Sequence, residues 1–216
     1  MRLVVVLALA FALVGSGAAL AARGDPQEKI NPADQARARA MLLRKADLGL
    51  SFQAQPSGGA NSNLECPALD ESDLTLTGKA ESSTFTGSFT FASSEAQIYE
   101  SVADANASWR RGTSAAGTAC LRDGLRREFA KEGLKLVSLR KIAFPRIAQK
   151  SAAYRIALAG QSQSVTVRVI LDVIVLMHLR AQVGVFIGSL VPPNKDDELR
   201  LGRLTAGRMA KAMRTA

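Results

Sequence analysis

The segments SVTVRVILDVIVLM (residues 164–177) and LRAQVGVFIGS (residues 179–189) decide the fold class of this chain. Both are rich in β-branched residues, which favour strands over helices. Their apolar run is long, but Arg168, Asp172 and His178 interrupt it, and we therefore reject a membrane-spanning helix. We expect the two segments to form a long hairpin of buried strands.

Further strand patterns precede this hairpin. Residues 134–144 form one expected strand, and residues 151–160 form another, with Tyr154, Ile156 and Leu158 on one face. Closer to the N-terminus, DLTLTGKAES (73–82) and STFTGSFTFA (83–92) alternate between apolar and polar positions, which is typical of a strand with one buried face.

The alternation is clearest over residues 83–92, where Phe85, Gly87, Phe89 and Phe91 share one face. We interpret this aromatic row as the core face of an antiparallel sheet. The alternative is a platform on which a ligand stacks.

Amphipathic patterns and capping residues indicate four helices, over residues 31–49, 94–109, 120–133 and 195–216. Asn31 is suited to cap the first helix. Ser94 and Gln97 match a capping box at the start of the second, and Gly133 is suited to end the third.

The expected order of elements is α-β-β-α-α-β-β-β-β-α. Runs of strands flanked by helices are typical of the α+β class, and we expect an antiparallel sheet of about five to six strands packed against helices. Residues 31–216 are expected to form this sheet and its helices as a single domain with one disulfide.

The N-terminal segment has the pattern of a secretory signal. Arg2 is followed by an apolar stretch over residues 3–14 and then by Ala19-Leu20-Ala21, a small-x-small cleavage site. We interpret residues 1–21 as a cleaved signal peptide and residues 22–30 as a polar leader. An uncleaved membrane anchor is the alternative. We expect the protein to be secreted or held in the cell envelope, outside the cytoplasmic membrane.

The chain has only two cysteines, Cys66 and Cys120. Cysteines of exported chains usually pair, because they meet an oxidising environment. A metal site needs more ligands, and a thiol nucleophile needs a histidine base, whereas the only histidine is His178. We therefore expect a Cys66–Cys120 disulfide that ties the third helix to the segment ahead of the first strand.

Asp172 is a candidate ligand-binding residue, because it interrupts an apolar strand and a buried carboxylate is unfavourable without a partner. Arg168, the second candidate, lies on the same strand face about 13 Å away, so the two cannot pair directly. Each can meet a partner on an adjacent strand. The hypothesis is a charged spot inside a cleft between sheet and helices, and the alternative is a solvent-facing or rim position. His178 is expected to lie partly exposed at the hairpin turn.

The chain is basic, with 28 lysines and arginines against 19 aspartates and glutamates and a formal net charge of +9. We expect cations of the helices to form one positive field that attracts anionic envelope polymers or lipid headgroups. Its candidate members are Arg110, Arg111, Arg126, Arg127, Arg200, Arg203, Arg208, Lys211 and Arg214. A scarcity of exposed aromatic residues disfavours nucleic acid. The alternative is a solvated face that keeps the protein soluble.

The sequence contains no catalytic constellation. It has no phosphate-binding glycine loop, no nucleophile elbow and no zinc signature. We therefore expect no enzyme activity, no cofactor and no metal, with a hydrolase of unrecognised site as an alternative.

Several segments together resemble exported domains of GC-rich Gram-positive bacteria, a family similar to the extracellular sensor domains of receptor Ser/Thr kinases and to related lipoproteins. The segments are LLRKADLGLSF (42–52), Cys66 ahead of DLTLTGKAES, SSEAQIYESVADANASW (93–109), AGTACLRDGL (116–125) and LGRLTAGRMAKAMR (201–214). The resemblance implies an α/β sandwich with an antiparallel sheet, a cleft and a ligand-sensing or envelope role without catalysis. This chain departs from the family in its single cysteine pair, and in reading DLGLSF where the family has a DLPxGW-like motif.

We therefore expect a secreted, non-enzymatic, sensor-like domain that holds a small or envelope-derived ligand between sheet and helices. The alternative is a module that adheres to anionic cell-envelope polymers or membrane headgroups through its basic surface. The sequence gives no indication of the oligomeric state.

Overall fold

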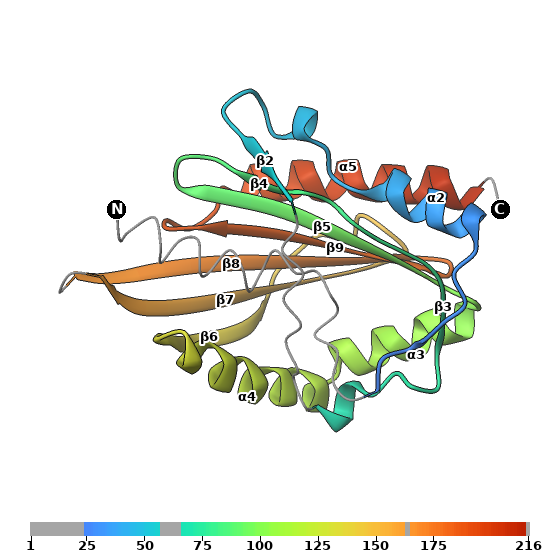
Figure 1. Ribbon diagram of the computed structural model, residues 1–216, viewed down its shortest axis with the longest axis horizontal. Coiled ribbons are helices and arrows are strands. Elements are labelled where there is room, and N and C mark those ends of the chain that lie inside the picture. The colour runs from blue at the N-terminus through green and yellow to red at the C-terminus, as the bar shows by residue number, and fades with distance from the viewer. Residues whose placement is uncertain (1–23, 57–65, 163–164, 215–216) are drawn as a thin grey trace.

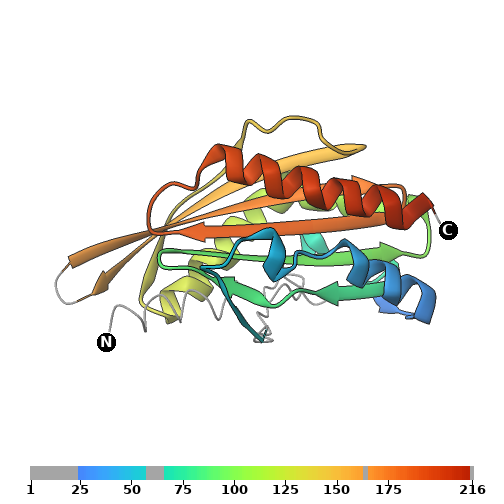
Figure 2. The same ribbon diagram turned by 90° about the horizontal axis from the view of Figure 1, so that it is seen from above.

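A computed structural model of the protein describes residues 24–56, 66–162 and 165–214 (Figure 1). One large sheet lies at its centre, with helices on both faces (Figures 1 and 2). Within the described ranges the sheet has nine strands in the order β1-β3-β5-β9-β8-β7-β6, and β4 pairs with β5 and with β2. The α+β class is confirmed.

The strands differ greatly in length: β1 Gln27–Glu28, β2 Gln53–Gln55, β3 Thr75–Glu81, β4 Thr84–Thr86, β5 Thr90–Tyr99, β6 Leu134–Ile142, β7 Lys150–Ser162, β8 Val165–His178 and β9 Ala181–Ser189. The pairs are antiparallel except that β1 runs parallel to β3. The sheet is therefore larger than expected and partly parallel. The two strands that were not expected, β1 and β2, have two or three residues each, which is too short for an alternating pattern to be recognised; the expected strand over residues 83–92 divides into β4 and the start of β5.

Helices cover the sheet in two layers. The described helices are α2 Pro32–Met41, α3 Val102–Thr113, α4 Ala115–Lys131 and α5 Lys195–Arg214, with short 3₁₀ helices η1 Lys45–Asp47 and η2 Pro67–Leu69. α2 and α5 lie on one face of the sheet, and α3 and α4 lie on the other (Figure 1). Gly133, with a φ of 72°, follows α4 where we expected that helix to end.

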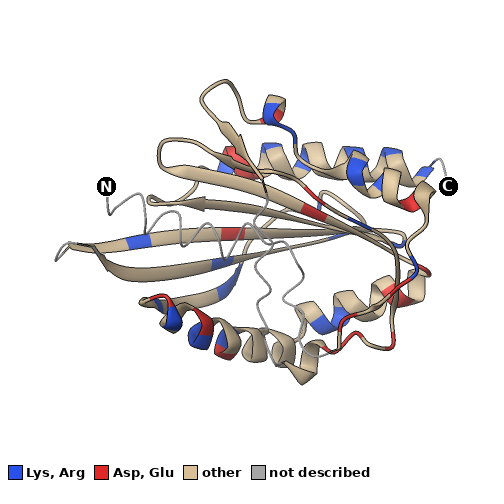
Figure 3. Cartoon of the chain, in the orientation of Figure 1, with Lys and Arg blue, Asp and Glu red and all other residues tan. Residues whose placement is uncertain are grey.

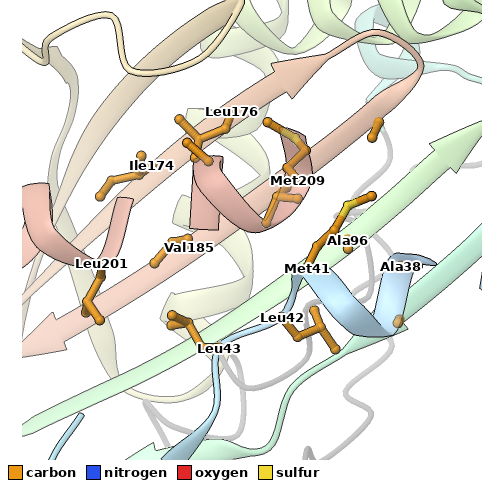
Figure 4. Close-up of a cluster of buried hydrophobic side chains, with 14 of the residues drawn as sticks. Ala38, Met41, Leu42, Leu43, Ala96, Ile174, Leu176, Val185, Leu201 and Met209 are labelled. Carbon is orange, nitrogen blue, oxygen red and sulfur yellow. The ribbon is translucent and has the colours of Figure 1, made fainter. Parts of the chain in front are cut away.

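The two faces of the sheet bury separate apolar clusters. Ala96 of β5 and Leu176 of β8 face α2 and α5, where they meet Met41 and Met209 (Figure 4). The alternate residues of β5, including Phe91, face the helices of the other layer. A strand buried on both faces shows no clean alternation in its sequence.

This burial explains the main error of the sequence analysis. The expected strand over residues 83–92 breaks after β4, and Phe89 lies in the turn with 60% of its surface exposed. β5 then continues to Tyr99, so Ser94 starts no helix. The helix begins at Val102, where the Ser101 side chain accepts a hydrogen bond from the backbone N–H of Asp104.

α2 is shorter than expected but begins as expected. The Asn31 side chain accepts a hydrogen bond from the backbone N–H of Asp34, which caps the helix. The helix ends at Met41 rather than near Gly49, because Leu42 has an extended backbone that leads the chain into the core.

β8 and β9 form the expected hairpin, paired from Ile170 and Ser189 to His178 and Ala181. Leu179 in its turn has a φ of 53°, and its N–H donates to the side chain of Gln149. His178 is half-buried beside the turn. In the described residues no helix is long and apolar enough to cross a membrane.

The expected disulfide joins Cys66 to Cys120, whose Cα atoms lie 5.6 Å apart. Cys66 immediately precedes η2, and Cys120 lies on α4. The bond therefore fastens α4 to the segment ahead of β3, as expected.

The N-terminal expectations are tested only in part. Residues 1–21, the expected signal peptide, lie outside the described residues. The expected polar leader, residues 22–30, contains β1, where the N–H of Gln27 donates to the carbonyl of Leu74 at 2.8 Å. Part of the leader is thus an edge strand of the sheet.

Candidate functional site

Asp172 lies within β8 and is fully buried, which contradicts the alternative of a solvent-facing or rim position. Arg155, opposite it on β7, donates from Nε to Oδ1 at 2.7 Å and from Nη2 to Oδ2. The same Nη2 donates to Oε1 of Glu198 on α5 at 3.2 Å. Arg168 is exposed and lies opposite Ala159, so the structure does not bring the two candidate ligand-binding residues together.

The cluster of Arg155, Asp172 and Glu198 contains two carboxyl groups and one guanidinium. Burial, and then Asp172, raise the pKa of Glu198 to about 8, against the opposing effect of Arg155. When Glu198 is protonated at neutral pH, Arg155 and Asp172 form one ion pair without net charge. The protonated Glu198 can also donate a hydrogen bond to Asp172. Both carboxyl groups are enclosed, whereas Arg155 keeps 23% of its side-chain surface exposed, and the cluster fastens α5 to the sheet.

The opposite face of the sheet carries a row of polar side chains, which we call the polar stripe: Thr86 of β4 and Ser93, Glu95 and Gln97 of β5. The three β5 residues alternate along the strand and therefore share the face of Phe91, toward the layer of α3 and α4. Thr86 is paired with Phe91 across the two strands and lies on the same face.

Three oxygen atoms of the polar stripe are buried and have no hydrogen-bond partner among the described residues. They are Oγ1 of Thr86, Oγ of Ser93 and Oε2 of Glu95. Nearly all buried polar atoms in proteins are hydrogen-bonded, and an unsatisfied one costs about 1–3 kcal/mol. The two other such atoms, in Tyr154 and Thr205, lie on elements outside the stripe. The stripe therefore concentrates unused hydrogen-bonding capacity.

Glu95 is the central member of the polar stripe. Burial, and then the facing carboxyl group of Glu81, raise its pKa to about 8, while Lys79 acts in the opposite direction. The carboxyl group is therefore mostly neutral at pH 7 and can both donate and accept hydrogen bonds. Gly184, its partner on β9, makes room for it, because a β-carbon there would lie 3.2 Å from Cγ of Glu95.

A hydrogen-bonded cluster around Tyr99 continues the stripe at one end. The Tyr99 hydroxyl lies 2.8 Å from Oγ of Ser108 and 3.0 Å from Oε1 of Gln97 and Oε2 of Glu71. A phenol has one proton and cannot donate to both acceptors. Burial raises the pKa of Glu71, and a protonated Glu71 can donate to Tyr99.

Part of the stripe borders solvent along β3. Lys79 and Glu81 face Gln97 and Glu95 across the strand pair, and all four residues keep part of their surface exposed. The enclosed atom of Glu95 is its Oε2.

His178 is not placed beside the serine of the stripe. His178 lies opposite Ala181 of β9, whereas Ser93 lies opposite Phe186, and five residues of a strand separate these positions by about 17 Å. In the described ranges, no group of three or more His, Cys, Asp or Glu side chains is placed to hold a metal.

None of the stripe residues was expected to be functional, and Gln97 was interpreted as a helix-capping residue. Their signal was weak, because Ser93, Glu95 and Gln97 alternate within a segment that also fits a helix cap. Only the pairing of β5 with β9 and β3 places them on one buried face.

The basic residues do not form the expected single field, because the sheet divides them (Figure 3). Arg110, Arg111, Arg126 and Arg127 lie on α3 and α4, and Arg200, Arg203, Arg208, Lys211 and Arg214 lie on α5. Four of these residues form ion pairs with nearby aspartates: Arg111 with Asp73, Arg126 with Asp123, Arg200 with Asp197 and Arg208 with Asp47.

No protein-family model and no curated protein matches the chain. The extracellular domain of PknH from Mycobacterium tuberculosis is 9% identical with a TM-score of 0.45, over 85% of this chain and 98% of that one. PA94, a protein of unknown function from Pseudomonas aeruginosa, is 15% identical with a TM-score of 0.20, over 61% of this chain and 75% of that one. Similarities of this strength support no conclusion about the function of this chain.

Proposed function

We propose that this protein is a non-enzymatic, sensor-like domain that binds a small polar ligand along the polar stripe. The observation that carries the proposal is the set of three buried oxygens on one face of β4 and β5 that have no hydrogen-bond partner within the described ranges. A ligand with both donor and acceptor groups would satisfy them, and the hydrogen bonds formed in this way would favour binding. The neutral carboxyl group of Glu95 suits an uncharged polar ligand.

The proposal includes export. The bond between Cys66 and Cys120 supports it, because disulfides persist in oxidising compartments and are rare in the cytosol. The ligand would then be a small or envelope-derived molecule that is available outside the cytoplasmic membrane.

Native mass spectrometry of the protein purified from its own host tests the proposal. We expect the wild type to carry a small molecule that is released on denaturation. The double variant Ser93→Ala/Glu95→Leu should lose it, because the variant replaces both polar groups by apolar ones. The matched control is Ser88→Ala/Glu132→Leu, which makes the same two changes at exposed positions and should retain the molecule.

Two results would contradict the proposal. A wild-type protein that carries and releases no small molecule would remove the binding function. A molecule that the stripe variant retains as well as the control does would place binding elsewhere. Circular dichroism of both variants shows whether each is folded, so that loss of the ligand is not confused with loss of structure.

A further inference from the structure

The outer surface of α2, η1 and α5 carries a group of exposed cations, of which Arg44 helps to lower the pKa of Asp47. Six basic side chains there are exposed and form no salt bridge among the described residues: Arg39, Arg44, Lys45, Arg203, Lys211 and Arg214. We call these six residues the basic face; they belong to the side of the sheet that α2 and α5 cover (Figure 3).

The carboxylates near the basic face already have partners. Asp47 accepts two hydrogen bonds from Arg208, at 2.6 and 2.8 Å, and Asp197 pairs with Arg200 at 3.2 Å. Glu198 is buried. Asp196 at the start of α5 is the remaining exposed acid of that helix. The cations of the basic face therefore act with little local compensation.

α5 presents its part of the basic face as a narrow row. At 100° per residue, Arg203, Lys211 and Arg214 fall within an arc of about 80° and span about 16 Å along the axis. The apolar side of the helix is buried in the core, where it contributes Leu201 and Met209. The outward side of α5 thus offers mainly charge, with Leu199 and Ala210 partly exposed beside it.

An exposed apolar side chain follows η1 and its cations along the chain. Leu50 follows η1 and is 97% exposed. Its loop projects from the same side of the sheet as α2 and α5 (Figures 1 and 2). A single exposed leucine is common on protein surfaces. Leu50, however, lies in a projecting loop that follows Arg44 and Lys45 in the sequence. Such a loop combines the apolar and cationic contacts by which proteins bind membrane surfaces.

We propose that the basic face docks on an anionic lipid bilayer, with Leu50 entering the interfacial region. Charge complementarity attracts the six cations to the headgroups. A soluble anionic polymer could use the same cations, but it would gain nothing from Leu50. The contribution of Leu50 therefore distinguishes a membrane from a polymer.

Sedimentation with lipid vesicles tests this docking. The probes are vesicles of mixed phosphatidylglycerol and phosphatidylcholine, with pure phosphatidylcholine as the neutral reference. We expect the full chain to prefer the anionic vesicles and the preference to fall steeply with salt. Residues 1–23 are identical in every variant, so differences between variants report on the basic face and not on the apolar N-terminal segment.

The variant Arg203→Gln/Lys211→Gln/Arg214→Gln should lower the partition coefficient on anionic vesicles about 100-fold, since each cation contributes about fivefold. Arg126→Gln/Arg127→Gln/Lys131→Gln removes the same charge from exposed positions on α4 and should change it less than about threefold. Leu50→Ser should lower it about 10-fold and leave binding to soluble polyglutamate unchanged.

Three outcomes would overturn the proposal. The first is a wild type with no preference for anionic over neutral vesicles. The second is an equal loss in the two triple variants, which would show that net charge alone matters. The third is a Leu50→Ser variant that binds vesicles as tightly as the wild type does, together with a wild type that binds polyglutamate as tightly as vesicles. This combination would make a soluble anionic polymer the partner. All of these substitutions lie at exposed positions, and thermal unfolding checks that each variant is folded.

Discussion

Among single residues, Glu198 has the clearest predicted effect on stability. Its pKa in the folded protein is about 8, because it is buried beside Asp172. In the unfolded chain a glutamate ionises near pH 4.3. Between these values the folded state keeps a proton that the unfolded state releases, so this residue lowers stability progressively as the pH rises from about 4.3 to about 8.

The Glu198→Gln variant removes this titration and keeps a side chain that can donate to Asp172 and accept from Arg155. We expect its free energy of unfolding, relative to wild type, to increase by on the order of 2 kcal/mol between pH 4.5 and pH 7.5. Urea unfolding at the two pH values measures this. The control Glu132→Gln, at an exposed position, should change by less than about 0.5 kcal/mol. A difference for Glu198→Gln that stays constant across the range would mean that Glu198 is ionised in the folded protein at neutral pH.

At the scale of elements, a buried ion pair fastens α2 to the hairpin turn of β8 and β9. Arg180 donates from Nη1 and Nη2 to the two carboxylate oxygens of Asp34, at 2.7 and 2.8 Å, and Thr77 donates to the same carboxylate at 2.7 Å. α2 can approach this closely because Gly78 lies below it; a β-carbon there would be 2.6 Å from the backbone oxygen of Asp34. The hydrogen bonds from Arg180 outweigh the opposing effect of burial, and they hold the pKa of Asp34 well below its usual range.

Asp34→Asn should therefore destabilise the protein at pH 7 by on the order of 3 kcal/mol, because it leaves the Arg180 guanidinium without its counter-charge. The pKa of Asp34 is lowered on folding, so its stabilisation is present above about pH 4 and decreases as the pH falls below that value. Urea unfolding of Asp34→Asn at pH 7 measures the loss. Asp123→Asn, which breaks the exposed pair with Arg126 on α4, is the control and should cost less than about 1 kcal/mol. Equal losses in the two variants would show that the α2 contact is no more than a surface ion pair.

For the molecule as a whole, the sequence predicted those elements whose patterns are local. β6 to β9 and α5 carry their period and their β-branched or amphipathic composition within one segment, and all were found. β5 was mistaken for a helix start, because its two faces are covered by helices from other parts of the chain, α2 and α5 on one side and α3 and α4 on the other. The polar stripe was missed for the same reason. Strand register aligns Glu95 with Gly184 and Glu81, and no local pattern specifies that register.

The disulfide is the contact between the most distant chain positions that the sequence predicted. Its effect on local stability should differ between the two helical layers. It joins residues 54 positions apart, and closing such a loop in the unfolded chain is worth about 4 kcal/mol on the chain-entropy model.

Because Cys120 lies on α4, reduction should also speed amide hydrogen exchange in α4 more than in α5, which packs on the other face of the sheet. Urea unfolding and hydrogen exchange with and without tris(2-carboxyethyl)phosphine measure both effects, and Cys66→Ser/Cys120→Ser should reproduce the reduced protein. An unfolding midpoint that reduction leaves unchanged would show that the bond does not constrain the unfolded chain, and equal acceleration in α4 and α5 would show that the layers do not respond separately.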